Sequence, residues 1–157
     1  MTHNSSSEEA RERLNWPITP DLYEQIRQLW LKHSMAKDKC DVDRLIETLT
    51  PTCVYEVVPT GQRWHGHDGA RAFYTSLIGA FPDVSFTLQH IVIGPQGVFE
   101  AAQLTATHQG VWAGIAPTGR AIRLSLMLYF PWDRELALFD GERVFFDRGE
   151  MDELLLC

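Results

Sequence analysis

Two side chains of this sequence, His108 and Asp147, have types and positions that suit acid–base chemistry. His108 lies near the end of a long stretch that predicts a strand, where it shares a face with Leu104 and Ala106. An imidazole, with an unperturbed pKa of about 6.5, both accepts and donates a proton near neutral pH. His108 is therefore a candidate general acid or base, and a structural histidine held by hydrogen bonds is the alternative.

Asp147 directly follows the large apolar residues Val144–Phe146, at the end of the last predicted strand. Removal from water raises the pKa of a carboxyl group and makes the carboxylate a stronger base. Asp147 also precedes a predicted helix, so a simple helix N-cap is the alternative. Glu100 and Glu142 are further acids in mostly apolar strands, where each can instead face solvent or pair with an arginine.

Amphipathic aromatic residues lie on several separate predicted elements and are suited to the wall of a cavity. Each joins an apolar ring to a polar group that can form a hydrogen bond with a ligand carbonyl. Ordinary core packing is the alternative for every one of them. The residues predicted to bind a ligand are Tyr55, Trp64, His90 and Tyr129.

His65 and His67 are two residues apart, on one side of a predicted strand, which is a spacing that a metal ion can use. No third ligand follows at a recognisable spacing, and His67 lies beside Asp68 at a strand-to-helix boundary, where histidines often bond to the backbone. We therefore predict no metal site. The motifs of nucleotide-binding loops, zinc proteases and serine hydrolases are absent from the sequence, and no cofactor is predicted.

Helices dominate the first half of the chain. The sequence Thr19-Pro20-Asp21 combines an N-cap, a first-turn proline and an acid near the positive helix end. Asp41 is placed to cap a second helix that Pro51 would end. The predicted helices span about residues 20–36, 42–49, 68–79 and 149–156.

Strands dominate the second half. Alternating apolar residues predict strands over residues 53–58, 62–65, 84–93, 98–112 and 121–130, followed by one last strand. The turn before that strand is either Trp132–Glu135 or Phe139–Gly141, and we prefer the first, which leaves Glu142 inside the strand. Helices followed by a long meander indicate an α+β fold, with a curved antiparallel or mixed sheet wrapped around the N-terminal helices. Such a curled sheet, closed on one side by helices, encloses a conical pocket.

The composition describes a single acidic domain. The chain has 157 residues, 45% of them hydrophobic, and a formal charge of −7, which disfavours nucleic acid and anionic membrane as partners. Its three cysteines have no paired spacing, and no apolar run is long enough to span a membrane. We predict a flexible tail over residues 1–18, one domain over residues 19–157 and a cytoplasmic location.

Several short motifs, in this order and spacing, resemble the SnoaL-like polyketide cyclases of the nuclear transport factor 2-like superfamily. The resemblance covers about residues 20–156. The motifs that carry it are Trp64–Ala70 with Phe73 and Tyr74, Phe81-Pro82-Asp83, Thr107–Gly110, Gly114 with Pro117–Arg120, and Phe146-Asp147.

This resemblance implies a cone-shaped α+β barrel, a homodimer formed through the outer sheet face, and a cavity open at one end. Cyclases of this type catalyse an intramolecular aldol condensation with an acid–base pair and without cofactor or metal. By position, His108 and Asp147 match the family's histidine and the acid that ends its last strand. The family's further acid, in the strand after Pro-Thr-Gly, has no carboxylate counterpart here, since residues 121–129 contain only Arg123 and Ser125 as polar candidates.

We therefore expect a cofactor-independent enzyme that performs aldol cyclisation or isomerisation on a small, mostly apolar carbonyl compound or ester. His108 and Asp147 are its predicted catalytic residues. One alternative is a non-catalytic module that binds a small ligand, which the missing carboxylate favours. Another is an epoxide or ester hydrolase in which Asp147 activates water.

Overall fold

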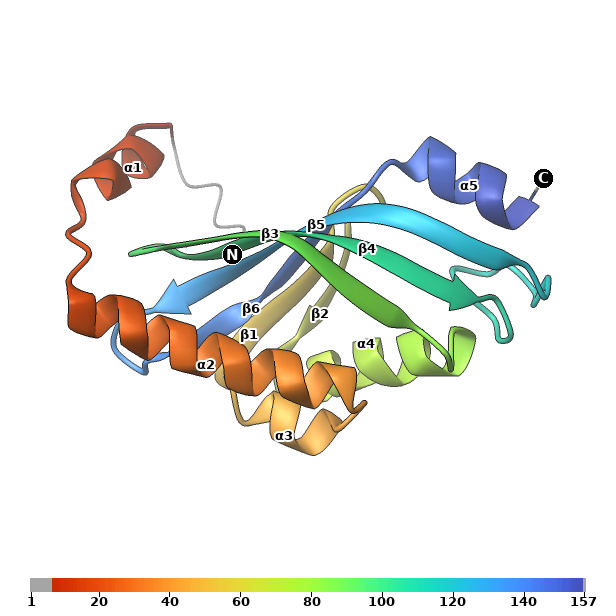
Figure 1. The fold of residues 1–157 in the computed structure, drawn as a ribbon, viewed down its shortest axis with the longest axis horizontal. Coiled ribbons are helices and arrows are strands. Elements are labelled where there is room, and N and C mark those ends of the chain that lie inside the picture. The colour runs from red at the N-terminus through yellow and green to blue at the C-terminus, as the bar shows by residue number, and fades with distance from the viewer. Residues whose placement is uncertain (1–6, 157) are drawn as a thin grey trace.

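The computed structural model describes residues 7–156, which form five α-helices, one short 3-10 helix and a six-stranded sheet (Figure 1). Among these residues no helix is both long and apolar enough to cross a membrane. The elements, in chain order, are α1 (Ser7–Glu12), η1 (Arg13–Asn15), α2 (Pro20–Asp38), α3 (Val42–Ile46), β1 (Leu49–Val57), β2 (Gln62–His65), α4 (Gly66–Ala80), β3 (Ser85–Gly94), β4 (Gly97–Thr107), β5 (Ala121–Asp133), β6 (Leu138–Phe145) and α5 (Arg148–Leu156).

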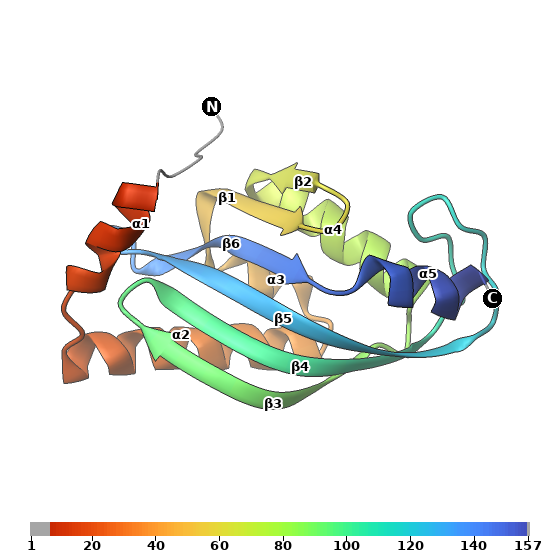
Figure 2. The same cartoon turned by 90° about the horizontal axis from the view of Figure 1, so that it is seen from above.

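The six strands form one curled sheet in the order β2-β1-β6-β5-β4-β3. The β1–β6 pair is parallel and the other pairs are antiparallel, which confirms the predicted α+β class with a mixed sheet. Helices α2, α3 and α4 cover one face of the sheet, and α5 follows β6 beyond the end of that strand (Figures 1 and 2). The apolar side chains of the inner face and of the helices make the core.

The predicted starts of α2 and α3 are confirmed, whereas α4 begins at Gly66, two residues before the predicted start. The Thr19 hydroxyl accepts the Leu22 backbone N–H at 3.1 Å, with Pro20 in the first turn of α2. The Asp41 carboxylate accepts the Arg44 N–H at 3.1 Å and caps α3.

The predicted end of α3 is wrong, because the helix stops at Ile46 and Pro51 lies inside β1. The Phe139 N–H already donates to the Thr48 carbonyl, so pairing with β6 begins before the proline. Pro51 is exposed and sits where the β1–β6 register shifts between Leu49 and Val54, so its missing N–H costs the sheet no hydrogen bond.

The last hairpin confirms the preferred turn. Strand β5 runs to Asp133, and the Asp133 carboxylate accepts the Glu135 and Leu136 N–H groups in the turn that follows. Gly141 and Glu142 accordingly lie inside β6. Because Leu128 pairs with Val144, and side chains alternate along a strand, Glu142 and Val144 both face the inner side of the sheet.

Part of the predicted N-terminal tail is helical. Residues 7–15 form α1 and η1, and the Trp16 ring lies 4.6 Å from the Arg134 guanidinium. Residues 1–6 lie outside the described residues. The flexibility of residues 1–18 stays a prediction.

Gly141 is the glycine on which the position of Glu142 depends most directly. Its φ is +114°, and a Cβ there would collide with the Val54 backbone of the neighbouring strand. We expect Gly141→Ala to destabilise the protein by at least about 2 kcal/mol, read as a lower urea midpoint.

Gly61→Ala is the matched control, since Gly61 also has a positive φ of +72° but no atom close to where an added Cβ would lie. Gly61→Ala should lower the free energy of unfolding by only about 1–2 kcal/mol, which is the cost of a positive φ for a residue with a Cβ. Equal losses for both variants would contradict a role of close strand packing at Gly141.

Candidate active site

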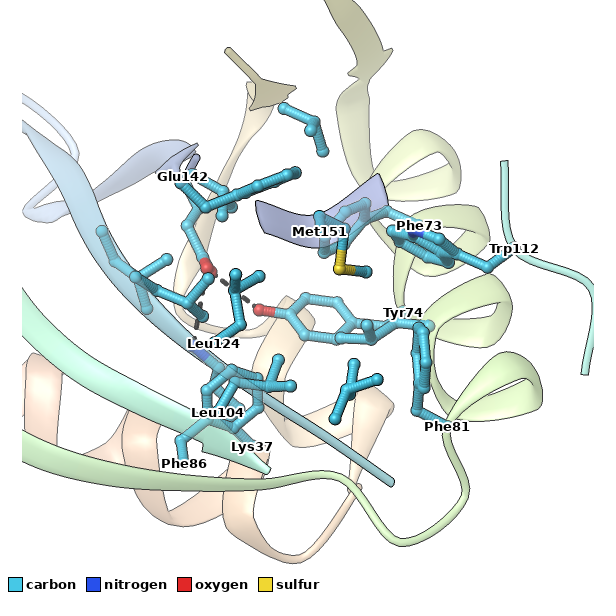
Figure 3. A pocket seen from close by; sticks show the side chains of 17 residues that line it. Lys37, Phe73, Tyr74, Phe81, Phe86, Leu104, Trp112, Leu124, Glu142 and Met151 are labelled. Carbon is cyan, nitrogen blue, oxygen red and sulfur yellow. Dashed lines mark hydrogen bonds and ion pairs between the residues drawn. The ribbon is translucent and has the colours of Figure 1, made fainter. Parts of the chain in front are cut away.

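An apolar cavity of about 50 Å³ lies between the inner face of the sheet and the helices. Its wall is made of aliphatic and aromatic side chains, and among residues 7–156 the only charged side chains that line it are those of Lys37 and Glu142. Figure 3 shows Trp112 on the side away from Glu142 and Met151 of α5 beside the cavity.

Glu142, Lys37 and Tyr74 meet at one end of the cavity, although they come from β6, α2 and α4 (Figure 3). The Lys37 ammonium lies 3.5 Å from Glu142 Oε1, and the Tyr74 hydroxyl donates to Glu142 Oε2 at 2.8 Å. The side chains of Lys37 and Glu142 are 8% and 3% exposed. This is a buried ion pair with a phenol as a further donor to the carboxylate.

Two opposing effects act on the Glu142 carboxyl. Burial alone would raise its pKa, but the Lys37 ammonium and the hydrogen bond from Tyr74 hold the pKa below the usual 4.5. The pKa of Tyr74 lies well above 10, because its phenol is buried and faces the Glu142 charge. At neutral pH the site therefore contains a carboxylate and a phenol that keeps its proton.

A second layer of polar groups lies behind Glu142. The Tyr55 hydroxyl donates to the Tyr74 hydroxyl at 3.3 Å. On the other side, His33 Nε2 is 3.7 Å from Glu142 Oε2, and His33 Nδ1 is 2.7 Å from the Thr48 hydroxyl. All of these side chains are buried.

Helical and strand periodicity explain how these residues reach one place. On α2, Ile26, His33 and Lys37 lie on one stripe that faces the sheet, with spacings of seven and four residues. On β6, the inward parity of Val144 also turns Glu142 inward. Sequence reasoning identifies Glu142 only as an acid in an apolar strand and misses Lys37 altogether. The signal for Lys37 was its place four residues after His33 on the buried stripe.

His108 is fully buried, but it is not among the residues that line the cavity. Its Nδ1 accepts the Thr118 backbone N–H at 3.3 Å, which leaves the proton on Nε2. That Nε2 has no hydrogen-bond partner among the residues that the structure describes. The ring packs beside Phe81, with the ring centres 5.5 Å apart, and Phe81 is itself a wall residue.

Asp147 is exposed and also lies outside the cavity lining. Its carboxylate accepts the Glu150 N–H at 3.1 Å at the start of α5, which is the N-cap arrangement expected as the alternative to a catalytic role. The structure therefore does not bring Asp147 and His108 together in the cavity. Their catalytic roles stay predictions.

The four predicted ligand-binding residues also lie outside the cavity lining. Tyr55 is buried behind Tyr74, and Trp64 packs on Phe73 at 5.1 Å between ring centres. His90 pairs with Ala101 and Tyr129 with Phe99, and the register places both on the outer sheet face. Tyr129 stacks on Phe99 there, with the ring centres 4.3 Å apart.

Within residues 7–156 no cluster of three or more His, Cys, Asp or Glu side chains is arranged to hold a metal ion. The His67 ring bonds to the Leu49 carbonyl at 3.1 Å, which is the backbone role that competes with metal binding at this position.

The Lys37–Glu142 pair can be tested by removing one charge. Lys37→Met should destabilise the fold by about 3–5 kcal/mol at pH 7, because it leaves a buried carboxylate without its counter-ion. The double variant with Glu142→Gln should recover part of that loss. Urea unfolding of the two single variants and the double variant gives the coupling energy.

The same pair predicts a pH dependence. A carboxyl group with a lowered folded-state pKa stabilises the fold above its unfolded pKa, near 4.5, and loses that contribution as the pH falls through the folded value. In Lys37→Met the burial that raises the Glu142 pKa is no longer offset by the ammonium, so the stability difference between wild type and Lys37→Met should shrink as the pH falls from that raised pKa toward the wild-type pKa of about 2. A difference that does not change between pH 7 and pH 3, or additive single losses, would show that the two groups are not coupled.

Comparison with known proteins supports the same fold. The family model of the SnoaL-like polyketide cyclases matches residues 21–135. A search of curated proteins found no match. Among solved structures, a protein of Jannaschia sp. CCS1 assigned to the SnoaL-like polyketide cyclases superposes with a TM-score of 0.78 at 19% identity, covering 90% of this chain and 97% of that one.

Two Streptomyces proteins have the same architecture. IdmH from Streptomyces antibioticus, assigned as a polyketide cyclase, has a TM-score of 0.67 at 20% identity and covers 83% of this chain and 98% of its own. AclR from Streptomyces galilaeus, assigned as a hydroxylase, has a TM-score of 0.69 at 19% identity, with coverages of 85% and 96%. The similar structures thus share a fold and differ in assigned activity. The family match, which covers most of the domain, shows that this chain belongs to the SnoaL-like polyketide cyclase family, with the nuclear transport factor 2-like fold.

Proposed function

We propose that the protein is a cofactor-independent acid–base enzyme that acts on a small, mostly apolar carbonyl compound bound in the cavity. Glu142 removes a proton from the carbon next to the carbonyl group, and Lys37 holds the oxygen that becomes negative. The resulting enolate then attacks a second carbonyl group in an aldol cyclisation, or is reprotonated elsewhere in an isomerisation. The observation that carries this proposal is the buried Lys37–Glu142 pair at the end of an apolar cavity.

The net charge of the cavity does not change in this reaction, which suits a site that excludes water. Before the reaction, the Lys37 ammonium is balanced by the Glu142 carboxylate. After proton transfer Glu142 is neutral and the enolate oxygen balances the same ammonium, so the net charge of the cavity is unchanged. A low-dielectric site that penalises an isolated charge therefore does not penalise this transfer.

The low pKa of resting Glu142 does not prevent this step. A carbonyl oxygen that draws the Lys37 ammonium away from Glu142 weakens the main interaction that lowers the pKa, while the burial that raises it remains. Glu142 thus becomes a stronger base when the substrate arrives. Tyr74, whose phenol stays protonated, keeps the carboxylate oriented through its 2.8 Å hydrogen bond.

The resting cavity of about 50 Å³ is smaller than the roughly 300–1,000 Å³ of typical ligand sites. Ligand entry therefore requires wall side chains to move. Trp112, in the segment between β4 and β5, and Met151, on the short C-terminal helix, are wall residues outside the sheet and can move without breaking strand pairing.

The proposed base can be tested with 2-tetralone, an apolar bicyclic ketone with acidic protons next to its carbonyl group. The protein in D₂O should accelerate deuterium incorporation at that position, measured by NMR. Glu142→Gln keeps the shape of the side chain and removes the base, so it should slow the catalysed exchange by about 10²–10⁴-fold.

Asp147→Asn and His108→Phe provide the comparison, because both residues lie outside the cavity lining. Exchange should change less than about threefold in Asp147→Asn, because asparagine caps a helix about as well as aspartate does. Loss of exchange in Asp147→Asn with normal exchange in Glu142→Gln would reverse the assignment and restore Asp147 as the base. His108, with its unpaired Nε2–H, is the remaining donor that a ligand oxygen could reach if the wall at Phe81 opens.

A non-catalytic binding module is the second candidate. The observation that favours it is that Glu142 is already satisfied by Lys37 and Tyr74, as in a site that only recognises a polar group. In that case 2-tetralone would bind without exchange. The hydrolase alternative has no support from the cavity, because Asp147 is exposed and lies outside its lining.

The cytoplasmic location stays a prediction. We also propose that the protein forms a homodimer through the outer face of the sheet. Large apolar side chains are exposed on that face, opposite the helices. These are Val92 (67% exposed), Phe99 (44%), Met127 (53%) and Phe145 (38%). A contiguous exposed patch of this kind is typical of a protein interface, and a second copy of the chain presents the same patch about a twofold axis.

Met127→Glu tests the dimer, since it places a charge at the centre of the patch. Wild-type protein should sediment near twice 17.9 kDa at micromolar concentration, and Met127→Glu near 17.9 kDa. Met35→Glu is the matched control, because Met35 is similarly exposed (57%) but lies on α2, in the helical layer. A wild-type monomer, or dissociation in both variants, would contradict this interface.

A further inference from the structure

His33 is a fully buried histidine that the proposed reaction does not use. It lies on α2 with 1% of its surface exposed and packs edge-on against Phe130 and Phe139, with ring centres 5.1 and 5.9 Å away. It does not line the cavity, so it does not touch a ligand there. Its two nitrogens nevertheless have very different surroundings, and the difference fixes where its proton lies.

The Nδ1 side faces a hydroxyl that already uses its own proton. The Thr48 hydroxyl donates to the Leu45 carbonyl at 2.6 Å, and the same oxygen lies 2.7 Å from His33 Nδ1. A hydroxyl has one proton to donate and lone pairs to accept with. Since the proton is directed to Leu45, the contact with His33 requires an Nδ1–H donor.

The Nε2 side faces a carboxylate that it does not bond. Nε2 is 3.7 Å from Glu142 Oε2, beyond hydrogen-bond distance, and has no partner among the described residues. Glu142 Oε2 instead accepts from Tyr74. This spacing fits two acceptors that face each other, and burial, which lowers the pKa of His33, keeps the ring neutral.

We propose that Thr48 locks His33 as the neutral Nδ1–H tautomer, so that the bare Nε2 accepts a hydrogen bond from Glu142 once Glu142 has taken a proton. His33 is then a positioning residue that stabilises the protonated form of the base. This inference rests on the proposed role of Glu142. The proton comes from the substrate carbon, whose C–H electron pair becomes the enolate, and it stays on Glu142, with its O–H turned to Nε2, until the product takes it back.

The other charged and titratable groups are compatible with this arrangement. Around Glu142 these are Lys37 from α2, Tyr74 from α4 and Tyr55 from β1. Glu100 from β4 accepts the Trp30 indole N–H at 2.9 Å. Lys37 and Tyr74 donate to Glu142, and the Nε2 of His33 is an acceptor without a partner among the described residues to which the protonated carboxyl can turn.

The tautomer can be measured directly in the ligand-free protein. In ¹⁵N-histidine-labelled protein at pH 7, with the His33 signals assigned by their loss in His33→Gln, Nδ1 should give a protonated and Nε2 an unprotonated resonance. Thr48→Val, which keeps the side-chain shape but removes the acceptor, should shift population toward the Nε2–H tautomer. Thr48→Ser keeps the hydroxyl and should retain the wild-type pattern.

An Nε2–H tautomer or a doubly protonated His33 ring in the wild-type protein would overturn the proposed tautomer, with or without catalytic activity. A wild-type pattern in Thr48→Val would overturn the role of Thr48. These outcomes do not depend on the proposed reaction, so failure of the lock and failure of the function are distinguishable.

The contribution of His33 to the reaction is tested with the 2-tetralone exchange assay. Thr48→Val should lower the maximal exchange rate about tenfold, the size of one buried hydrogen bond, with KM nearly unchanged, and Thr48→Ser should restore it. Equal rates in Thr48→Val and wild type would overturn the role of His33 while leaving Glu142 as the base. No exchange in wild type would overturn the proposed function, and the assistance by His33 with it.

Discussion

The buried ion pair between Lys37 and Glu142 is the constraint on which the rest of the site depends. The side chains of Lys37 and Glu142 are only 8% and 3% exposed, so both charges have lost most of their hydration, which costs free energy. Their mutual attraction and the hydrogen bond from Tyr74 offset that cost. The pair connects α2 with β6 across the core. Among the described residues that line the cavity, these two side chains are the only charged ones. A core of this kind could have been filled with leucine at a lower cost, so the charges point to chemistry or recognition.

The fold supplies what that pair requires. Helix α2 crosses the concave face of the sheet and presents His33 and Lys37 one turn apart, while the parallel pairing of β1 with β6 places Tyr55 opposite Glu142. The positive φ of Gly141 lets β1 and β6 approach closely at the residue before Glu142. The polar groups therefore extend in layers from Lys37 and Glu142 at the cavity wall, through His33, to Thr48. In the proposed arrangement Thr48 determines which nitrogen of His33 carries the proton, and so which hydrogen bond His33 can form with Glu142.

Local signals in the sequence predicted most of the elements, but they do not determine which side chains line the cavity. The caps at Thr19 and Asp41 and the choice of the earlier turn in the last hairpin are determined by a few neighbouring residues, and these are confirmed. Which acid enters the cavity depends instead on how β6 pairs with β1 and on which helix crosses above it. Asp147 has the stronger local signal, three apolar neighbours, but the chain has left the sheet there and the carboxylate caps α5 in solvent. Lys37, an ordinary lysine by sequence, is buried only because α2 packs on the concave face.

The proposed chemistry takes place at one end of one cavity, and a crystal structure with 2-naphthol tests it most directly. This planar phenol has the shape of the enol of 2-tetralone, and its oxygen stands for the oxygen that becomes negative. We predict that the oxygen lies within hydrogen-bond distance of Lys37 Nζ and beside Glu142, with the rings among the apolar wall residues. A ligand that binds elsewhere, or inside the cavity with its oxygen turned away from an intact Lys37–Glu142 pair, would contradict the proposed role of the pair.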